Sequence, residues 1–307
     1  MKKIFTLVLF VLIPIFVFSQ SLSSFKLSKQ WLTKIEKIAP EGKGLKIKKN
    51  ILIFSLHTGF NHWTIPHTES VMKLIADKSN DFNVTVSKDI SVFEKKSIKK
   101  YDGIILNNNC SDRERRDLLW DALKPDSNLS KKQRLKKAKK LENNLLNHIK
   151  KGNGVMIMHG GIVMQNNSLA FSEMAGGSFD FHPVQQNIHI KLVDPNHPLV
   201  KSFDPTGFVH YDEPYFFKND YLNYNFRPLL YMDLDEIKMK RQRPIDKVKY
   251  LSWIKKYGAG RVFYSSPSHN AQSMEDPKLL SFFLNGLYYV VGAIECDDSP
   301  MSMSELK

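Results

Sequence analysis

Cysteine is scarce in this chain, which has only Cys110 and Cys296 among its 307 residues. Two cysteines cannot build a disulfide-dense scaffold, and no C-x-x-C pair offers a cysteine-based metal site. Whether the two cysteines pair with each other is left open by the sequence. With 42% hydrophobic residues, 15 glycines and 14 prolines, the composition is that of a globular protein with a sizeable core.

Arginine is also scarce in this chain. The chain carries 45 lysines and arginines against 31 acidic residues, a net charge of +14, but only eight of the 45 are arginine. Proteins that read nucleic acids depend on arginine for bidentate and stacked contacts. We therefore expect no nucleic-acid partner, and we interpret the lysines of residues 130–151 as the solvated face of a helix.

A short apolar run opens the chain. Two lysines precede the segment from Ile4 to Phe18, which contains Pro14. Its 15 residues fall short of the roughly 20 that a membrane-spanning helix needs, and Ser19 ends a plausible cleavage site. We predict a signal peptide over residues 1–19, export to the periplasm or the outside of a bacterial cell, and no stable membrane anchor.

Strand and helix patterns alternate in the first half of the chain. Buried or alternating strands are expected at 51–55, 82–86, 101–107 and 154–158. Helical patterns follow at 64–75, where Thr64 is placed to cap the helix, and twice within 112–151. This alternation predicts an α/β fold with a doubly wound, mostly parallel sheet.

Short strands and a final helix characterise the second half. The strands are expected at 188–193, 208–211, 227–232, 250–254 and 261–265, as an antiparallel extension of the sheet. A helix over 276–291 carries leucine and phenylalanine at helical spacing and should cover one sheet face. We find no repeat and no linker, so we predict one domain.

Three histidines follow strands of the predicted sheet. In sheets of this kind ligands lie beyond the carboxyl ends of the strands, so we expect His62, His159 and His269 to converge. Their imidazoles are candidates to hold a divalent metal ion or to act as metal-free acids and bases. No motif such as H-E-x-x-H distinguishes the two.

An acidic pair supplies the carboxylate of this predicted site. Neighbouring carboxylates on a strand point to opposite faces, so we expect only one of Asp212 and Glu213 at the site. We choose Glu213, as general base or as a metal ligand, with His159 as its catalytic partner. Glycines surround His159 as they would a nucleophile, but the turn holds neither cysteine nor serine at its tip, which argues against a glutamine amidotransferase or serine hydrolase.

With these residues in place, the chain resembles the ThuA-like (trehalose utilisation) family. The matching motifs, in order, are Thr58-Gly59-Phe60 with His62, Tyr101-Asp102-Gly103, Gly154 to His159, Gly176-Gly177-Ser178-Phe179 with His182-Pro183, His197-Pro198, Asp212-Glu213-Pro214-Tyr215, and Gly260 to Tyr264 with His269. The resemblance implies the fold of class I glutamine amidotransferases without their catalytic cysteine, and a small sugar or glycoside as ligand.

The resemblance also sets the expected domain boundaries. It covers residues 50–293, preceded by a polar segment over 20–49 and followed by a tail over 294–307. The chain departs from the family in a lysine-rich stretch near 127–140, which looks like a helical insertion, and in Ser268, where the family usually has glycine before the histidine.

The groups expected to bind the sugar are polar or aromatic residues of the matched motifs. Trp63 and Tyr215 are candidates to stack on sugar rings, while Asn108 and the amide of Gly160 are candidates to stabilise an oxyanion. The full set of predicted substrate-binding residues is Thr58, Gly59, Trp63, Asn108, Gly160, His182, Gln185 and Tyr215.

Three functions fit these features. The favoured one is an exported enzyme acting on glycosides or keto-sugars as a lyase, isomerase or hydrolase, through His/Glu acid–base or metal-assisted chemistry. The second is a carbohydrate-binding module that uses the same pocket without turnover, and the third is an interaction protein that uses the basic helix. The substrate, the reaction and the oligomeric state are left open.

The export prediction has a direct test. Secreted material should have an intact mass that begins at Gln20 or close to it, because signal peptidase removes the apolar run. A product that keeps Met1 and stays in the membrane fraction would instead indicate an uncleaved anchor.

Overall fold

The computed structural model describes residues 22–241, 247–302 and 305. The predicted signal peptide, residues 1–19, and part of the predicted tail lie outside these residues. No helix within the described ranges is long and apolar enough to cross a bilayer.

Nine strands form one sheet in the order β2-β1-β3-β4-β11-β10-β9-β6-β7. They are β1 (Lys49–Phe54), β2 (Phe82–Ser87), β3 (Gly103–Asn107), β4 (Gly154–Met158), β6 (Gln186–Leu192), β7 (Phe208–Asp212), β9 (Arg227–Asp233), β10 (Val248–Tyr257) and β11 (Gly260–Ser265). Strands β2, β1, β3, β4 and β11 run parallel, and β10, β9, β6 and β7 continue the sheet with antiparallel pairs. The predicted fold class is confirmed.

Two details of the sheet differ from the prediction. Strand β11, expected in the antiparallel part, is the junction, because it pairs parallel with β4 and antiparallel with β10. A separate small sheet of β5 (Ser178–Phe181) and β8 (Phe216–Lys218) was not predicted, since runs this short carry little periodicity.

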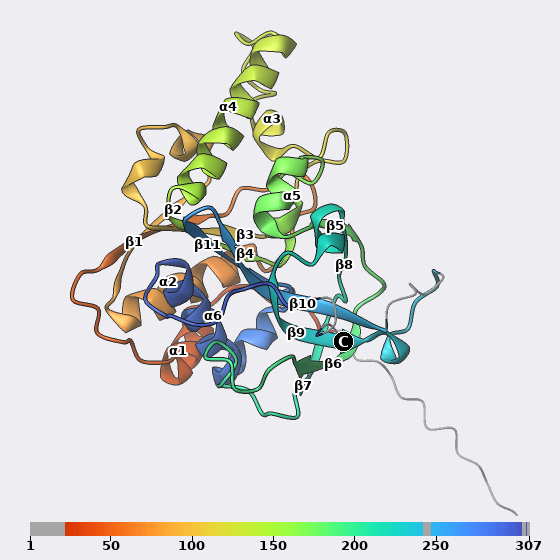
Figure 1. Cartoon of the computed structure of the whole chain (residues 1–307). Helices are drawn as coiled ribbons and strands as arrows, with labels where there is room; N and C mark the ends of the chain where they lie inside the picture. Colours follow the sequence, from red (N-terminus) through yellow and green to blue (C-terminus); the bar gives the residue numbers. More distant parts are fainter. Residues whose placement is uncertain (1–21, 242–246, 303–304, 306–307) are drawn as a thin grey trace, which may run out of the picture.

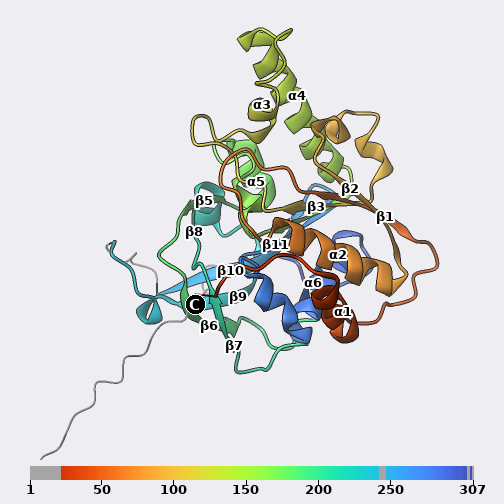
Figure 2. The same cartoon turned by 180° about the vertical axis from the view of Figure 1, so that it is seen from behind.

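Helices cover both faces of the sheet (Figures 1 and 2). One face carries α1 (Lys29–Ile38), α2 (Ile65–Ser79) and α6 (Pro277–Val290), and the other carries α3 (Leu118–Ala122), α4 (Lys131–Lys150) and α5 (Leu169–Ala175). Each layer has its own buried apolar cluster, so the sheet is sandwiched between two cores.

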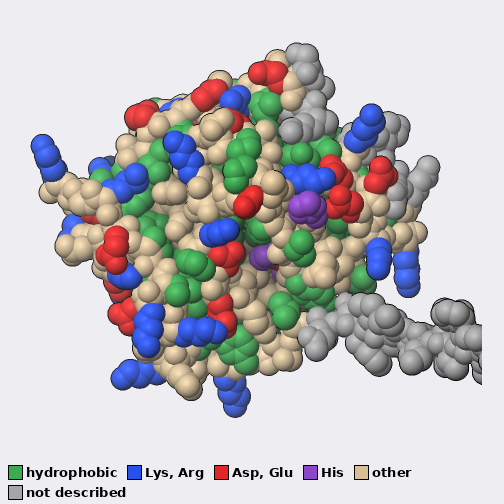
Figure 3. Space-filling model, turned by 90° about the horizontal axis from the view of Figure 1, so that it is seen from below, with side chains coloured by type: hydrophobic (Ala, Val, Ile, Leu, Met, Phe, Trp, Pro, Cys, Tyr) green, Lys and Arg blue, Asp and Glu red, His purple; other side chains and the backbone are tan. Residues whose placement is uncertain are grey.

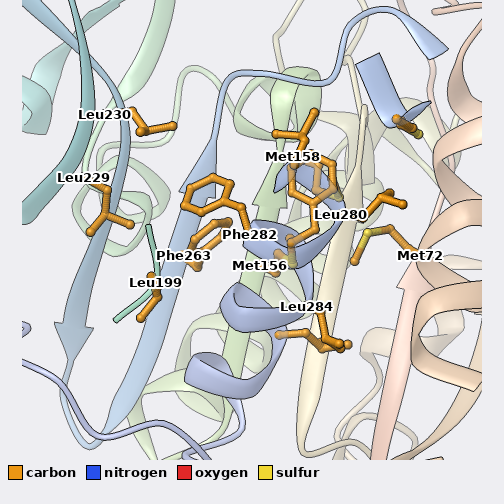
Figure 4. Close-up of a cluster of buried hydrophobic side chains, with 14 of the residues drawn as sticks. Met72, Met156, Met158, Leu199, Leu229, Leu230, Phe263, Leu280, Phe282 and Leu284 are labelled. Atoms are coloured by element: carbon orange, nitrogen blue, oxygen red, sulfur yellow. The ribbon is translucent and has the colours of Figure 1, made fainter. Parts of the chain in front are cut away.

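The core beneath α6 shows how the layers are held together. Phe282 and its neighbours on α6 face Met156 and Met158 of β4 and Phe263 of β11 (Figure 4). The rings of Phe282 and Phe263 lie 5.1 Å apart. Burying one such side chain contributes about 1.5–3 kcal/mol, so this face strongly fixes the position of α6 on the sheet.

Helix α4 presents its lysines to solvent. Ser130 and Gln133 form a reciprocal capping box at its start, and Leu141, Leu145 and Ile149 are buried against the sheet. Its first turns project beyond the body of the molecule (Figure 1). On the face seen in Figure 3, basic and acidic side chains are interspersed.

The predicted side-chain cap of α2 is wrong. Thr64 is the N-cap residue, but its backbone has φ −83° and ψ −8°, and its hydroxyl caps nothing. An N-cap side chain reaches the first amides from an extended backbone, which this residue does not have. Pro66 in the first turn lacks an N–H, which removes one amide that would need a cap.

Asp81 joins the N-terminal segment to the domain. Its buried carboxylate accepts hydrogen bonds from the amides of Lys43, Gly44 and Leu45, at 2.6–3.2 Å, and from the hydroxyl of Tyr288 on α6. Burial raises the pKa of Asp81, but the hydrogen bonds from Tyr288 and the amides outweigh burial and hold it below its usual value.

We predict that Asp81→Asn lowers the free energy of unfolding by about 1–3 kcal/mol, because buried donors lose a charged acceptor. The native pKa lies below the ordinary value of 3.8, so the difference from wild type should be fully present above that pH. It should shrink as the pH falls through the native pKa.

Urea unfolding from pH 3 to 7 measures this difference. The matched control is Asp77→Asn, whose carboxylate pairs with Lys73 and is 50% exposed, and which should change stability by no more than about 0.5 kcal/mol. Equal effects of the two variants would contradict the role of Asp81.

Candidate active site

His159 lies at the tip of a tight strand-to-helix turn. It follows β4 directly, begins the 3-10 turn His159–Val163, and has a left-handed backbone with φ 43°. The two glycines after it allow close packing, since a Cβ at Gly161 would lie 2.5 Å from the carbonyl oxygen of Leu106. A left-handed backbone costs a non-glycine residue about 1 kcal/mol or more, so the fold holds this histidine in place against strain.

Four side chains converge around this turn. His62, His159, Glu213 and His269 each offer a ligand atom, and these atoms all lie within 4.8 Å of one another. The three imidazole rings are 5.1–5.2 Å apart between centroids. The two carboxylate oxygens of Glu213 lie 3.3 Å from Nε2 of His159 and 3.4 Å from Nε2 of His269. The expected convergence of the three histidines is observed.

The second nitrogen of each ring faces a partner outside the cluster. Nδ1 of His159 donates to the carbonyl oxygen of Ser266 at 2.8 Å. Nδ1 of His269 lies 3.4 Å from the side-chain oxygen of Asn270, and Nδ1 of His62 lies 3.7 Å from the thiol of Cys110. This pattern leaves Nε2 of each ring available, and it is how proteins orient metal-binding histidines.

The pair of His159 and Glu213 needs a cation between its members. Because Nδ1 of His159 carries the proton given to Ser266, the neutral ring turns the lone pair of Nε2 toward the carboxylate. Burial lowers the pKa of His159, but the hydrogen bond that its protonated ring would donate to Glu213 and the charges of Asp212 and Glu213 outweigh burial and raise it. Burial raises the pKa of Glu213, yet His159 outweighs that effect and lowers it. Both shifts favour a positive charge between the imidazole and the carboxylate, which a proton or a metal ion would supply.

The other two histidines are neutral. Burial, with the charges of His159 and His269, holds the pKa of His62 well below its usual value. Burial and His159 lower the pKa of His269. Neutral imidazole is the form that binds metal ions.

Asp212 fixes the backbone of two members of the cluster, Glu213 and His269. One oxygen accepts Nε2 of His210 at 2.8 Å and the amides of Ser268 and His269 at 3.1 and 3.3 Å. The other oxygen accepts the amide of Glu213 at 2.7 Å. Burial raises the pKa of Asp212, but His210 and the nearby histidines outweigh burial and keep the pKa far below its usual value.

As expected, only one of the two acids, Glu213, faces the histidines, although strand alternation is not the reason. Strand β7 ends at Asp212, so Glu213 lies beyond it and strand alternation no longer separates the two. Glu213 faces the histidines, while Asp212 holds the backbone that carries Glu213 and His269.

The aromatic residues are placed differently from the prediction. The ring of Tyr215 lies 4.2 Å from that of His159, and burial raises the pKa of Tyr215 well above its usual value, so it is a phenol. Trp63 instead packs against Phe25 and His67 near α1. Phe60, 65% exposed, lies 4.7 Å from the ring of His62 and is the aromatic residue at the rim.

Two predicted oxyanion groups bind each other. The amide of Gly160 donates to the side-chain oxygen of Asn108 at 3.1 Å. It is therefore committed within the protein, contrary to the expectation that it faces substrate.

The other predicted substrate-binding residues shape the surroundings of the cluster. The amides of Thr58 and Gly59 donate to the carbonyl oxygen of Cys110, and the hydroxyl of Thr58 donates to Asp121. Gln185 accepts from Asn270 at 3.2 Å. Nδ1 of His182 lies 3.7 Å from Glu213.

The side chains in and beside the cluster differ in their exposure to solvent. The side chains of His159 and His269 are 0% and 5% exposed, whereas Glu213 is 10% and His182 36% exposed. Glu213 is therefore more exposed than either histidine, and the partly exposed His182 lies next to it.

Cys110 takes no part as a thiolate. Burial raises the pKa of Cys110 to about 12, so the group beside His62 is a neutral thiol. Cys110 and Cys296 are both free.

Comparison with known proteins identifies the family and the fold. No curated protein matches the chain. Among solved structures, a ThuA-like protein from Bacteroides uniformis has a TM-score of 0.59 at 16% identity, covering 82% of this chain and 94% of the other. One from Parabacteroides merdae has a TM-score of 0.54 at 18% identity, covering 83% and 96%. At such identities the similarity establishes the fold. The family model for trehalose utilisation matches residues 50–290, and the chain therefore belongs to the ThuA family.

Proposed function

We propose that the chain binds one divalent transition-metal ion through His62, His159 and His269 and uses it, with Glu213 as general base, in proton-transfer chemistry on a carbohydrate. The convergence of four buried ligand groups within 4.8 Å carries the proposal. The carbohydrate substrate is supported by the trehalose-utilisation description of the family, and a location outside the cytoplasm by the predicted signal peptide.

The donor set favours a transition metal. Imidazole nitrogens suit Zn²⁺, Fe²⁺, Ni²⁺ and Cu²⁺ better than Mg²⁺ or Ca²⁺. Catalytic sites characteristically use three protein ligands and keep a position open for water or substrate. A metal ion would also replace the proton between His159 and Glu213 as the cation that this pair requires.

Glu213 is the best placed of the four groups to act as the base. It is the most exposed of them, and its oxygens face His159 and His269 within 3.4 Å. A divalent ion held by the three histidines would supply a Lewis acid that stabilises negative charge on a sugar's carbonyl oxygen. Glu213 would take the proton from the carbon next to that carbonyl, and the electron pair of the C–H bond would move to the carbonyl oxygen to give an enolate. This is the first step of an isomerisation or an elimination.

We predict different losses for the histidines and the carboxylate. His159→Ala and His269→Ala should lose the bound metal and turnover together. Glu213→Gln should keep one metal ion per chain and lose about 10²- to 10⁴-fold in turnover, the usual contribution of a general base. Elemental analysis and a screen of keto-sugars measure the two properties.

The matched control is His197→Ala, because His197 is a buried histidine bonded to Asp297 rather than to the cluster. It should keep both metal and turnover. Loss of metal in Glu213→Gln would make Glu213 a ligand instead of the base. Sugar binding without any turnover would favour a carbohydrate-binding module, and a metal-free wild type with full turnover would contradict the metal.

A further inference from the structure

We infer that the groove beside His182 binds an anionic group of the substrate, the carboxylate of a uronic-acid sugar. This inference rests on the proposed function for the substrate being a sugar. It adds a substrate class that neither the family description nor the metal cluster supplies.

The groove has the size and the charge for such a group. Its volume is about 510 Å³, and its lining residues are Phe181, His182, Pro183, Val184, Lys238, Met239, Lys240 and Arg241. This volume is within the range of small-molecule sites, roughly 300–1,000 Å³. Three of the lining side chains are cations and none is an acid, so the groove is complementary to an anion.

His182 connects the groove to the catalytic cluster. It lines the groove, its Nδ1 lies 3.7 Å from an oxygen of Glu213, and its ring stacks on Tyr215 with centroids 5.7 Å apart. The side chain of His182 is 36% exposed, so the groove is open to solvent next to Glu213. A sugar anchored by its carboxylate in the groove would therefore extend its ring toward Glu213.

Hydrogen bonds and ring stacking hold the cationic side of the groove, which comprises Lys238, Lys240 and Arg241, in position. The side-chain amide of Gln186 donates to the carbonyl oxygen of Lys238 at 3.0 Å and accepts its amide at 2.8 Å. The guanidinium of Arg241 lies 4.4 Å from the ring centre of Phe181, which in turn stacks on Phe216 at 4.5 Å. A stacked guanidinium keeps its planar donors for bidentate contact with a carboxylate.

The three cations have no carboxylate partner within the part of the chain that the structure describes. Elsewhere lysines of this half of the molecule do pair, as Lys191 does with Asp233 and Glu236. Concentrating unpaired positive charge beside a catalytic site favours anionic ligands, and an exposed Val184 adds an apolar edge for a sugar ring.

A matched set of sugars tests the inference. We expect the zinc-loaded full chain to bind methyl β-D-glucuronide about tenfold more tightly than methyl β-D-glucoside at low salt, because only the glucuronide can form ion pairs with the three cations. The uncharged methyl β-D-glucuronamide should bind like the glucoside. Titration calorimetry measures all three, and the preference should weaken as salt is raised.

Two triple variants, each of which removes three positive charges, show which part of the surface causes the preference for glucuronide. Lys238→Gln/Lys240→Gln/Arg241→Gln should abolish the preference for glucuronide. Lys131→Gln/Lys132→Gln/Lys136→Gln, on the projecting part of α4, should retain it. Equal affinities for the glucuronide and the glucoside would overturn the inference, as would equal losses in the two variants. Tighter binding of glucose 6-phosphate than of the glucuronide would overturn the assignment of a carboxylate.

Zinc content separates this inference from the proposed function. The groove variant should keep one zinc per chain, because none of its substituted residues lies in the cluster. A glucuronide preference in a protein that binds no zinc would uphold the groove and contradict the metal. One bound zinc without any preference would contradict the groove alone.

Discussion

The parallel register of β1, β3, β4 and β11 is the constraint on which the site depends. Phe54 pairs with Leu106, Asn107 with Met158, and Met158 with Ser265, so the four strands end at nearly the same level. Neighbouring strands lie about 4.8 Å apart, so loops that leave four adjacent ends can bring imidazoles together. The cores on both faces hold the sheet, and through it the spacing of these loops.

The antiparallel half of the sheet contributes the two buried carboxylates of the site. Strand β7 ends at Asp212, so Asp212 and Glu213 lie at the same edge of the sheet. The ionised Asp212 accepts hydrogen bonds from the amides of Ser268 and His269. Burying carboxylates costs several kcal/mol each unless they are paired, and here pairing is provided by His210, His159 and backbone amides. Two buried acids and three buried histidines lie together at one edge of the sheet. Such costly clusters of buried titratable groups are typical of functional sites.

The sequence predicted those parts of the site that follow from strand order. His62, His159 and His269 could be found because each lies in the segment that follows a strand, and α6 because its apolar spacing is helical. The path of a loop depends on contacts distant in sequence, so Trp63 was assigned to the sugar site although it packs near α1, and Phe60 beside His62 was given no role. The choice of Glu213 over Asp212 was right for a different reason, because β7 ends at Asp212 and strand alternation does not extend to Glu213. The bond between Asn108 and Gly160 depends on neighbouring loops, which periodicity does not describe.

A crystal soaked in zinc tests the central claim most directly. The account predicts one anomalous-scattering peak about 2.0–2.1 Å from a nitrogen of each of His62, His159 and His269, the usual zinc–imidazole distance, with the carboxylate of Glu213 beside it. Ordered imidazoles with no peak between them, or a zinc ion bound only elsewhere on the chain, would contradict it.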